Sequence, residues 1–490
     1  MFAKVLSSAV LGLDGYIVEV EVDMAQGLPS FEVVGLPNVA VRESRDRVRA
    51  AIKNTGYGFP LRRITVNLAP ASVKKEGASF DLPVAIGVLA AMGEIPQEPV
   101  SRLLITGELS LAGGARPVPG ILPMAAAARQ QGLAGILLPV DNAKEAALVR
   151  ELPVYPVTCL REAVEFLCGK RVIHRFEGEA ARVPANLESA VDFSEVRGQE
   201  AAKRALEVAA AGAHNVLMVG PPGSGKTMLA RRLPTILPEM TREEALEVTR
   251  IYSIAGLLPP GGGLVSSRPF RTPHHTATVA GLIGGGSQAR PGEVTLGHHG
   301  VLFLDELSEF RAEALEALRQ PLEDGKVAIV RAQASFSYPS RFQLLAAQNP
   351  CHCGFFGDPV RACTCTEAQM RAYKAKLSGP FLDRIDIYLN VPRWIGGDSS
   401  QEGDLLTASE PEDSRTIRGR VEEARRRQRR RFAEFGISAN AQMRMGEIRR
   451  FCTLDARAKI LLDTATRQLG LTARAQARLL KVARTVADLA

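Results

Sequence analysis

A glycine-rich stretch, Gly220-Pro-Pro-Gly-Ser-Gly-Lys-Thr227, has the spacing G-x-x-x-x-G-K-[ST] of a phosphate-binding loop. The apolar run 215–219 precedes it, and a helix-compatible segment, 228–233, follows it. A strand that leads through such a turn into a helix N-terminus points backbone N–H groups at a polyphosphate. We expect Lys226 to reach the β- and γ-phosphates and the Thr227 hydroxyl to bind Mg²⁺. The nucleotide-binding residues expected here are Gly220, Pro221, Pro222, Gly223, Ser224, Gly225, Lys226 and Thr227.

Two acidic residues follow a second apolar run about eighty residues later. Residues 301–304, Val-Leu-Phe-Leu, are typical of a buried parallel strand, and Asp305 and Glu306 come directly after it. A carboxylate pair at the end of a strand suits ATP hydrolysis, with Asp305 in the Mg²⁺ shell and Glu306 polarising the attacking water. The chain is therefore expected to be an ATP hydrolase that uses ATP and Mg²⁺.

Four of the seven cysteines form two close pairs, Cys351 with Cys353 and Cys363 with Cys365. Four thiolates at this spacing are able to close a tetrahedral shell, which structural Zn²⁺ prefers. His352 is a weaker further ligand, and free or redox-active thiols are the alternative. The cluster predicts a structural metal with no open coordination position.

Length, composition and charge indicate a large soluble protein. The 490 residues correspond to about three domains, no run of 18 apolar residues occurs, and the start does not read as a signal peptide, so we expect a cytoplasmic protein that does not enter a membrane. Residues 415–490 hold 19 Lys and Arg against 7 Asp and Glu, although the whole chain carries only +8. The arginine-rich run 425–431 lies in an expected helix, 414–435, where it either faces nucleic acid or forms a solvated face.

The expected fold class is α/β with three domains. Residues 1–170 alternate strand-like and helical stretches, 171–190 form a connector, and 191–395 form a P-loop ATPase core with a parallel sheet. The acidic segment 396–414 is expected to be a flexible linker, and 415–490 a helical, basic lid domain.

A glycine-rich insertion separates the two nucleotide motifs and contains Arg268-Pro-Phe-Arg-Thr-Pro-His-His-Thr276. Four of the seven histidines lie in it, but adjacent histidines on extended chain point to opposite faces, which disfavours a metal site. Together with the two nucleotide motifs and Ala347-Gln-Asn-Pro350, this stretch resembles the magnesium-chelatase-type branch of the AAA+ ATPases. Within that branch nearly the whole chain is similar to the ComM (YifB) family, DNA helicases of branch migration in natural transformation.

The resemblance implies roles for three more residues. Asn349 matches the sensor-1 position that orients the water near the γ-phosphate. Arg384, in Phe381-Leu-Asp-Arg-Ile-Asp386, resembles the arginine finger that reaches a neighbouring subunit's ATP, and Arg474 resembles sensor 2. A finger supplied in trans implies a ring, by family analogy a hexamer.

A strand-like stretch on either side of 331–334 resembles the hairpin that chelatase-branch helicases project into a central pore. Lys326, Arg331 and Gln333 are the residues expected to bind DNA, single-stranded or branched, through its phosphates and without reading sequence. An exposed hairpin without a ligand is the alternative.

The segments 75–82 and 106–120 resemble the protease domain of Lon, which has a ribosomal S5 domain 2-like fold, and the related C-terminal domain of RadA. Ser79 stands at the Lon nucleophile position, but Leu122 fills the position of the lysine base. Without a base a serine hydroxyl is a poor nucleophile at neutral pH, so a binding or ring-assembling domain is expected. The expected function is a ring-forming DNA translocase that promotes branch migration. A chelatase-like remodeller of a protein partner and an ATP-dependent peptidase are the alternatives.

Overall fold

A computed structural model describes residues 1–36, 38–73, 75, 77–178, 182–183, 191–259, 262–286, 290–330, 335–393 and 412–490. The chain forms two compact units, residues 1–183 with 242–266, and residues 184–241 with 267–490. This division differs from the expected boundaries. Segment 242–266 belongs with the N-terminal unit although it lies between the two nucleotide motifs in sequence, and the basic C-terminal segment is part of the same unit as the ATPase core.

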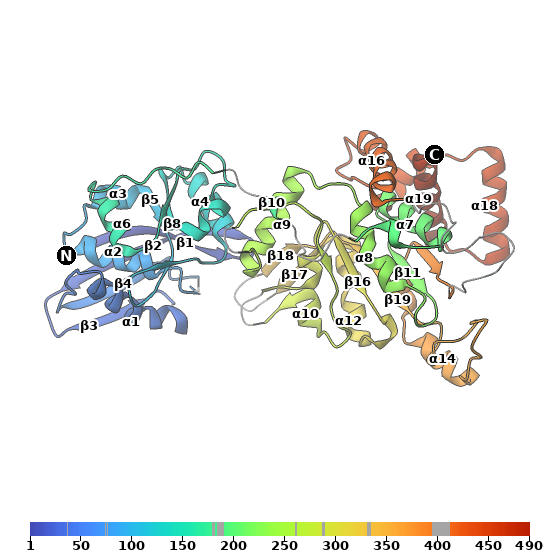
Figure 1. The fold of residues 1–490 in the computed structure, drawn as a ribbon, viewed down its shortest axis with the longest axis horizontal. Helices are drawn as coiled ribbons and strands as arrows, with labels where there is room; N and C mark the ends of the chain where they lie inside the picture. The colour runs from blue at the N-terminus through green and yellow to red at the C-terminus, as the bar shows by residue number, and fades with distance from the viewer. Residues whose placement is uncertain are drawn as a thin grey trace. The chain divides into compact units, whose positions relative to one another are not determined.

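The N-terminal unit contains a mixed seven-stranded sheet in the order β3-β4-β2-β1-β5-β8-β9 (Figure 1). Its strands are β1 (Phe2–Leu11), β2 (Asp14–Ala25), β3 (Ser30–Val34), β4 (Arg63–Ala69), β5 (Leu103–Ile105), β8 (Gly135–Pro139) and β9 (Val154–Val157). In β5, Leu103 and Ile105 join one apolar cluster and Leu104 joins another. Since successive side chains point to opposite faces, both faces of the sheet are covered.

Helices of the N-terminal unit supply the two covers. The cluster with Leu103 draws on α1, α2 and α6, and the cluster with Leu104 draws on α4 and α5. The unit also contains α9 and several short helices and strands. The bounds are α1 (Val39–Asn54), α2 (Asp81–Ala91), α3 (Gln97–Arg102), α4 (Ile121–Gln130), η1 (Val140–Asn142), α5 (Ala143–Ala146), α6 (Leu160–Leu167), α9 (Arg242–Ala255), and the paired short strands β6 (Glu108–Leu109) with β7 (Ala115–Arg116) and β10 (Arg182–Val183) with β12 (Leu264–Val265).

Helix α9 is attached to the N-terminal unit by polar contacts at its buried face. The Ser253 hydroxyl donates to the carboxylate of Glu145, and the Ser253 carbonyl accepts from the Gly120 amide at 3.1 Å. Glu145 also accepts from the Leu122 amide at 2.8 Å, and its burial raises the pKa of this carboxyl group. These contacts explain why 242–266 packs with the N-terminal domain, although Glu145 and Ser253 are 108 positions apart.

The second unit is built on a parallel five-stranded sheet in the order β13-β16-β19-β11-β20. Its strands are β11 (Val216–Val219), β13 (Phe270–Arg271), β16 (Val301–Leu304), β19 (Gln343–Gln348) and β20 (Ile387–Asn390). Val219 pairs with Gln348 and Leu304 with Ala346, so β11, β16 and β19 end at one edge. The loops that leave this edge carry the residues expected to bind ATP.

The helices of the second unit differ from the expectation at the arginine-rich helix. Helices α12 and α13 are separated at Leu318, because Pro321 has no N–H to donate to the carbonyl of Ala317. The helix expected over 414–435 ends at Arg431. The elements are η2 (Phe193–Glu195), α7 (Glu200–Gly212), α8 (Lys226–Ile236), α10 (Val279–Ile283), β14 (Gly284–Gly285), β15 (Arg290–Pro291), α11 (Glu293–Leu296), η3 (Leu307–Glu309), α12 (Ala312–Ala317), α13 (Arg319–Asp324), β17 (Lys326–Val330), β18 (Ser335–Pro339), α14 (Glu367–Ala375), α15 (Gly379–Leu382), α16 (Ser414–Arg431), η4 (Asn440–Gln442), α17 (Met445–Phe451), α18 (Ala456–Leu469) and α19 (Ala473–Leu489).

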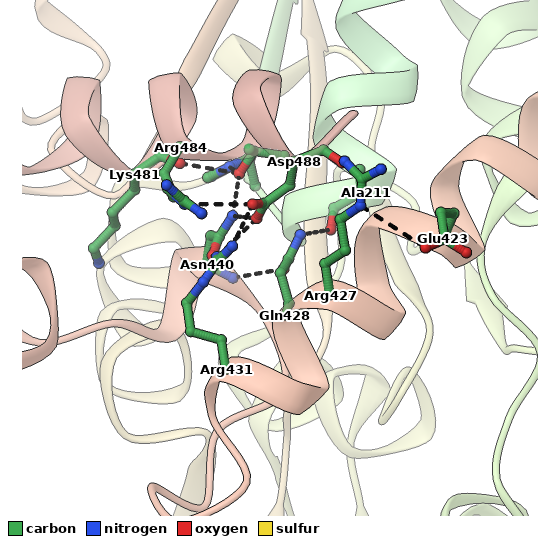
Figure 2. A network of polar contacts seen from close by, with 11 residues as sticks. Ala211, Glu423, Arg427, Gln428, Arg431, Asn440, Lys481, Arg484 and Asp488 are labelled. Atoms are coloured by element: carbon green, nitrogen blue, oxygen red, sulfur yellow. Dashed lines mark hydrogen bonds and ion pairs between the residues drawn. The ribbon is translucent and has the colours of Figure 1, made fainter. Parts of the chain in front are cut away.

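A buried polar network joins the C-terminal helices to the core of this unit (Figure 2). Gln428 of α16 donates to the carbonyl of Ala211 in α7 at 3.0 Å and accepts from the Asn440 amide at 2.9 Å. Asn440 donates to the carboxylate of Asp488 in α19 at 2.8 Å, and Arg431 donates to the same carboxylate. Since Gln428, Asn440 and Asp488 are all buried, their mutual hydrogen bonds hold α16 and α19 against α7.

None of the helices in the described ranges has both the length and the apolar character needed to cross a membrane. Most of the expected linker 396–414 lies outside the described residues. Of residues 412–414, which are described, Ser414 begins α16, and the Asp413 side chain caps the helix by accepting from the Thr416 amide at 2.8 Å.

Candidate active site and metal centre

The phosphate loop connects β11 to α8, as its spacing predicts. Gly225 has a φ of 90°, a left-handed conformation that glycine adopts without a Cβ clash, and it is the N-cap residue directly before α8. The Lys226 ammonium donates to the carbonyls of Gly220 and Pro221 at 2.7 and 2.9 Å. Burial lowers the pKa of Lys226, and the charge of Asp305 opposes this shift. In this structure Lys226 is therefore folded back onto the loop that it would leave for a phosphate.

Two oxygen groups suited to Mg²⁺ meet beside the loop. The Thr227 hydroxyl donates to the Asp305 carboxylate at 2.8 Å. A hydroxyl and a carboxylate are the hard oxygen ligands that Mg²⁺ takes, and Thr227 is exposed while Asp305 is half-buried. The residues fit the ion that the sequence predicts.

Glu306 lies next to this pair with an unusual backbone. Its φ of 53° and ψ of 48° are left-handed, which is uncommon for a residue other than glycine, and such strain clusters at functional sites. The Nδ1 atom of His275 lies 3.6 Å from the Glu306 carboxylate. Sequence reasoning weighed the histidines of this segment only as metal ligands and missed this pairing, for which no local spacing provides a signal.

Asn349 follows β19 and reaches the phosphate loop. Its Oδ1 atom lies 3.4 Å from the Lys226 ammonium, and its backbone carbonyl accepts from the Tyr373 hydroxyl at 3.1 Å. Lys226, Thr227, Asp305, Glu306 and Asn349 thus gather at one edge of the parallel sheet, from three segments that are far apart in sequence.

The two candidate arginines lie close to each other. Arg384 pairs with Glu323 of α13, and partial burial, together with nearby Arg319 and Arg474, lowers the pKa of Arg384. Arg474 lies 3.8 Å from the carboxylate of Asp383. The same helix, α19, is tied to the finger segment by another arginine, because Arg478 donates to the carbonyl of Ile385 at 2.6 Å. Arg384 and Arg474 therefore belong to one cluster of the same chain.

The four clustered cysteines converge as their spacing predicts. The Cys351 sulfur lies 3.4 Å from that of Cys353 and 3.7 Å from that of Cys363, and the last two are 3.6 Å apart. The Cys365 sulfur accepts from the Cys353 amide at 3.3 Å, and all four ligand atoms lie within 4.8 Å of one another. Hydrogen bonds from the amides of Phe355 and Thr364 lower the pKa of the Cys353 thiol to about 5.

These distances fit a tetrahedral metal. Sulfurs bound to zinc at about 2.3 Å in a tetrahedron are about 3.8 Å apart. The sulfurs of Cys351, Cys353 and Cys363, 3.4 to 3.7 Å apart, are too far apart for disulfides, whose sulfurs lie about 2.05 Å from each other. A Cys₄ cluster of this geometry is compatible with zinc.

The residues expected to bind DNA are only partly described. Lys326 is exposed at the start of β17, which pairs with β18 in an antiparallel hairpin, whereas Arg331 and Gln333 lie outside the described residues. The arginine-rich helix keeps Arg426, Arg429 and Arg430 exposed, as a solvated or nucleic-acid-facing surface requires, but uses other arginines internally. Arg425 donates to the carbonyl of Ala210 at 3.0 Å, and Arg427 donates to the carbonyl of Asp488 at 2.9 Å. The sequence analysis did not anticipate that arginines of this helix would bind backbone carbonyls of neighbouring helices.

In the N-terminal unit, the serine at the Lon nucleophile position is buried. Among the described residues no hydrogen bond joins the Ser79 hydroxyl to a lysine or a histidine, while its carbonyl accepts from the Gly107 amide at 3.0 Å. Leu122 is buried as well and donates its amide to Glu145.

Comparison with known proteins covers nearly the whole chain. The family described as magnesium chelatase, subunit ChlI, matches residues 192–398, and related ChlI descriptions match 20–142 and, as the C-terminal domain, 411–490. The chain is 42% identical to competence protein ComM of Haemophilus influenzae over 490 residues, which cover 99% of this chain and 94% of that one. It is 43% identical to protein YifB of Escherichia coli over 482 residues, 98% and 92% of the two chains. A Lon protease of Syntrophomonas wolfei is 26% identical over 163 residues, which cover 31% of this chain and 20% of that one.

Proposed function

Because the chain belongs to the family of ComM and YifB proteins, whose ATPase part is of the magnesium chelatase type within the AAA+ proteins, we propose that it is a ring-forming, ATP-driven DNA translocase. In this role it promotes branch migration during homologous recombination of incoming DNA in natural transformation, in the cytoplasm. The observation that carries the proposal is the gathering of Lys226, Thr227, Asp305, Glu306 and Asn349 at one sheet edge. The name of the Haemophilus influenzae relative, a competence protein, supports the biological setting.

Hydrolysis begins with Lys226 leaving the carbonyls of its own loop for the β- and γ-phosphates, since both are acceptors for the same ammonium. Thr227 and Asp305 would hold Mg²⁺, which would supply positive charge to neutralise the phosphates. Glu306 polarises the attacking water, and Asn349, which already touches Lys226, orients it. His275 is placed to hold the Glu306 carboxylate before nucleotide binding.

Arg384 acts on the ATP of a neighbouring subunit. Within one chain its guanidinium pairs with Glu323, so ring assembly exchanges this partner for the γ-phosphate. The proximity of Arg474 supports a role for both arginines at the same phosphate. Positive charge supplied in trans at this point is worth about 10³ to 10⁵ in rate in related reactions. A ring, by family analogy of six subunits, follows from this division of the site.

The β17–β18 hairpin grips DNA through phosphates. Lys326 stands exposed at its base, and Arg331 and Gln333 belong to the residues between its strands. Contacts with phosphates carry no sequence information, which suits a motor that moves along any DNA.

The N-terminal unit serves binding or ring assembly and not proteolysis. Ser79 is buried, and Leu122 offers no proton acceptor in place of the Lon lysine. One structural Zn²⁺ would be held by four thiolates, those of Cys351, Cys353, Cys363 and Cys365. The short distances among their sulfurs support this assignment.

The rate of ATP hydrolysis with and without single-stranded DNA tests the proposal. A translocase is stimulated by DNA alone, at unrelated sequences alike. A chelatase-like remodeller responds to a protein partner and not to DNA, and a peptidase responds to unfolded protein and cleaves it. Hydrolysis that DNA leaves unchanged contradicts the proposed function.

A further inference from the structure

The loop between the first and last clustered cysteines, residues 351–365, here called the cysteine loop, lies against the ATP site. It starts two residues after Asn349. Within it, Gly354 has a φ of 88°, and a Cβ at this position would stand 2.8 Å from the ring of Pro222 in the phosphate loop. The backbone of the cysteine loop therefore packs directly on the phosphate loop, with no room for a side chain between them.

A second connection runs through the helix that follows the loop. Tyr373 of α14 is buried, and its hydroxyl accepts from the Ser308 hydroxyl at 2.6 Å while donating to the carbonyl of Asn349 at 3.1 Å. Ser308 lies two residues after Glu306. One hydroxyl group thus connects the segment that carries the proposed general base with the residue that orients the water.

The cysteine loop has little else to hold its shape. Of residues 351–365, only Cys351 and Gly354 are buried. The Asp358 carboxylate accepts from the amides of Val360 and Arg361 at 2.8 and 3.0 Å and pairs with Arg393, but these bonds order only the middle of the loop. A segment with so small an apolar core depends on a cross-link or a metal for a fixed conformation.

We propose that the cysteine loop is a brace for the ATP site. A divalent cation that prefers thiolates, such as Zn²⁺, locks the loop against Pro222, and Tyr373 transmits this order to Asn349 and Ser308. The inference rests on the proposed function only in the assumption that Asn349 and Glu306 serve ATP hydrolysis. Tyr373 is then a positioning residue, which acts through Asn349 and Ser308. The metal takes no part in the chemistry, because four thiolates leave no open position.

Amide hydrogen exchange of the full-length protein, as purified and after removal of the metal with a chelator, tests the brace. We expect about one zinc per chain, and on its loss faster exchange in 351–365, in the phosphate loop 220–224 and in 306–309, with the N-terminal sheet unchanged. The double change Cys353→Ser and Cys363→Ser should reproduce this pattern. Faster exchange that stays within 351–365 would overturn the proposal, as would protein without stoichiometric metal. This readout needs neither hydrolysis nor DNA, so it succeeds or fails independently of the translocase assignment.

The change Tyr373→Phe isolates the transmitted step, because it removes one hydroxyl and keeps the ring. We expect an unchanged zinc content, an affinity for Mg-ATP within about twofold, and a kcat lower by about five- to tenfold, the cost of one buried hydrogen bond. Tyr155→Phe is the matched control, since Tyr155 packs on Phe166 in the N-terminal unit. A kcat equal to that of the control would show that Tyr373 transmits nothing.

Discussion

The polar network that holds the C-terminal helices gives the most quantitative prediction for a single side chain (Figure 2). Asp488 has only 2% of its side chain exposed and accepts from Arg431 and from Asn440, with Arg484 at 3.3 Å. The change Asp488→Ala leaves the Arg431 guanidinium, 12% exposed, without its carboxylate. Removing one partner of a buried pair costs about 3 to 5 kcal/mol. Because Arg431 keeps a hydrogen bond to Asn440 at 3.1 Å, we take about 3 kcal/mol, the lower end of that range.

A loss of this size makes local opening of α16 and α19 about 150-fold more frequent. Native-state amide exchange of the full chain measures it directly, because the amides of these helices report their own opening. The control is Glu423→Ala in α16, because its partners Arg426 and Arg427 are 59% and 46% exposed, so this change should cost less than about 1 kcal/mol. Equal effects of the two changes would refute the reasoning that burial of the Asp488 network holds α16 and α19 against α7.

Further predictions concern the proposed motor. Glu306→Gln should bind Mg-ATP nearly as well as the unchanged protein and lose most hydrolysis, and turnover within a few-fold of normal would contradict the role of Glu306. Arg384→Ala should hydrolyse ATP poorly and regain part of its activity when mixed with Lys226→Ala, which supplies an intact Arg384; mixing without any rescue would contradict a finger in trans. Arg331→Ala should weaken binding to unrelated DNA sequences equally and reduce the salt dependence, with ATP binding preserved. If the Arg331→Ala protein unwinds branched DNA at the normal rate, the DNA-binding residues lie elsewhere in the chain.

Local motifs made the geometry of the candidate ATP site predictable from sequence. The phosphate loop, the strand before Asp305, and the cysteine pairs each carry their chemistry within a few residues, and the structure brings them together as expected. Such features depend on backbone geometry and ligand preference, which a short spacing encodes.

Contacts between distant segments were not predictable in this way. The Tyr373 hydroxyl bridges residues 24 and 65 positions away, and α9 packs on a domain that ends well before it. The arginines of α16 were expected on a DNA-binding or solvated face, and Arg426, Arg429 and Arg430 are exposed, whereas Arg425 and Arg427 bind carbonyls of α7 and α19. Only tertiary packing decides which face of a helix is used, and no periodicity in one segment reveals its partner.

The central claim is that ATP hydrolysis drives movement along DNA, and branch migration on a synthetic three-stranded or four-way junction tests it most directly. The account predicts that the protein moves the branch point only with hydrolysable ATP, that Glu306→Gln binds the junction without moving it, and that the rate does not depend on base sequence. Branch movement that continues in the Glu306→Gln protein, or none at all by a protein that binds both ATP and the junction, would contradict it.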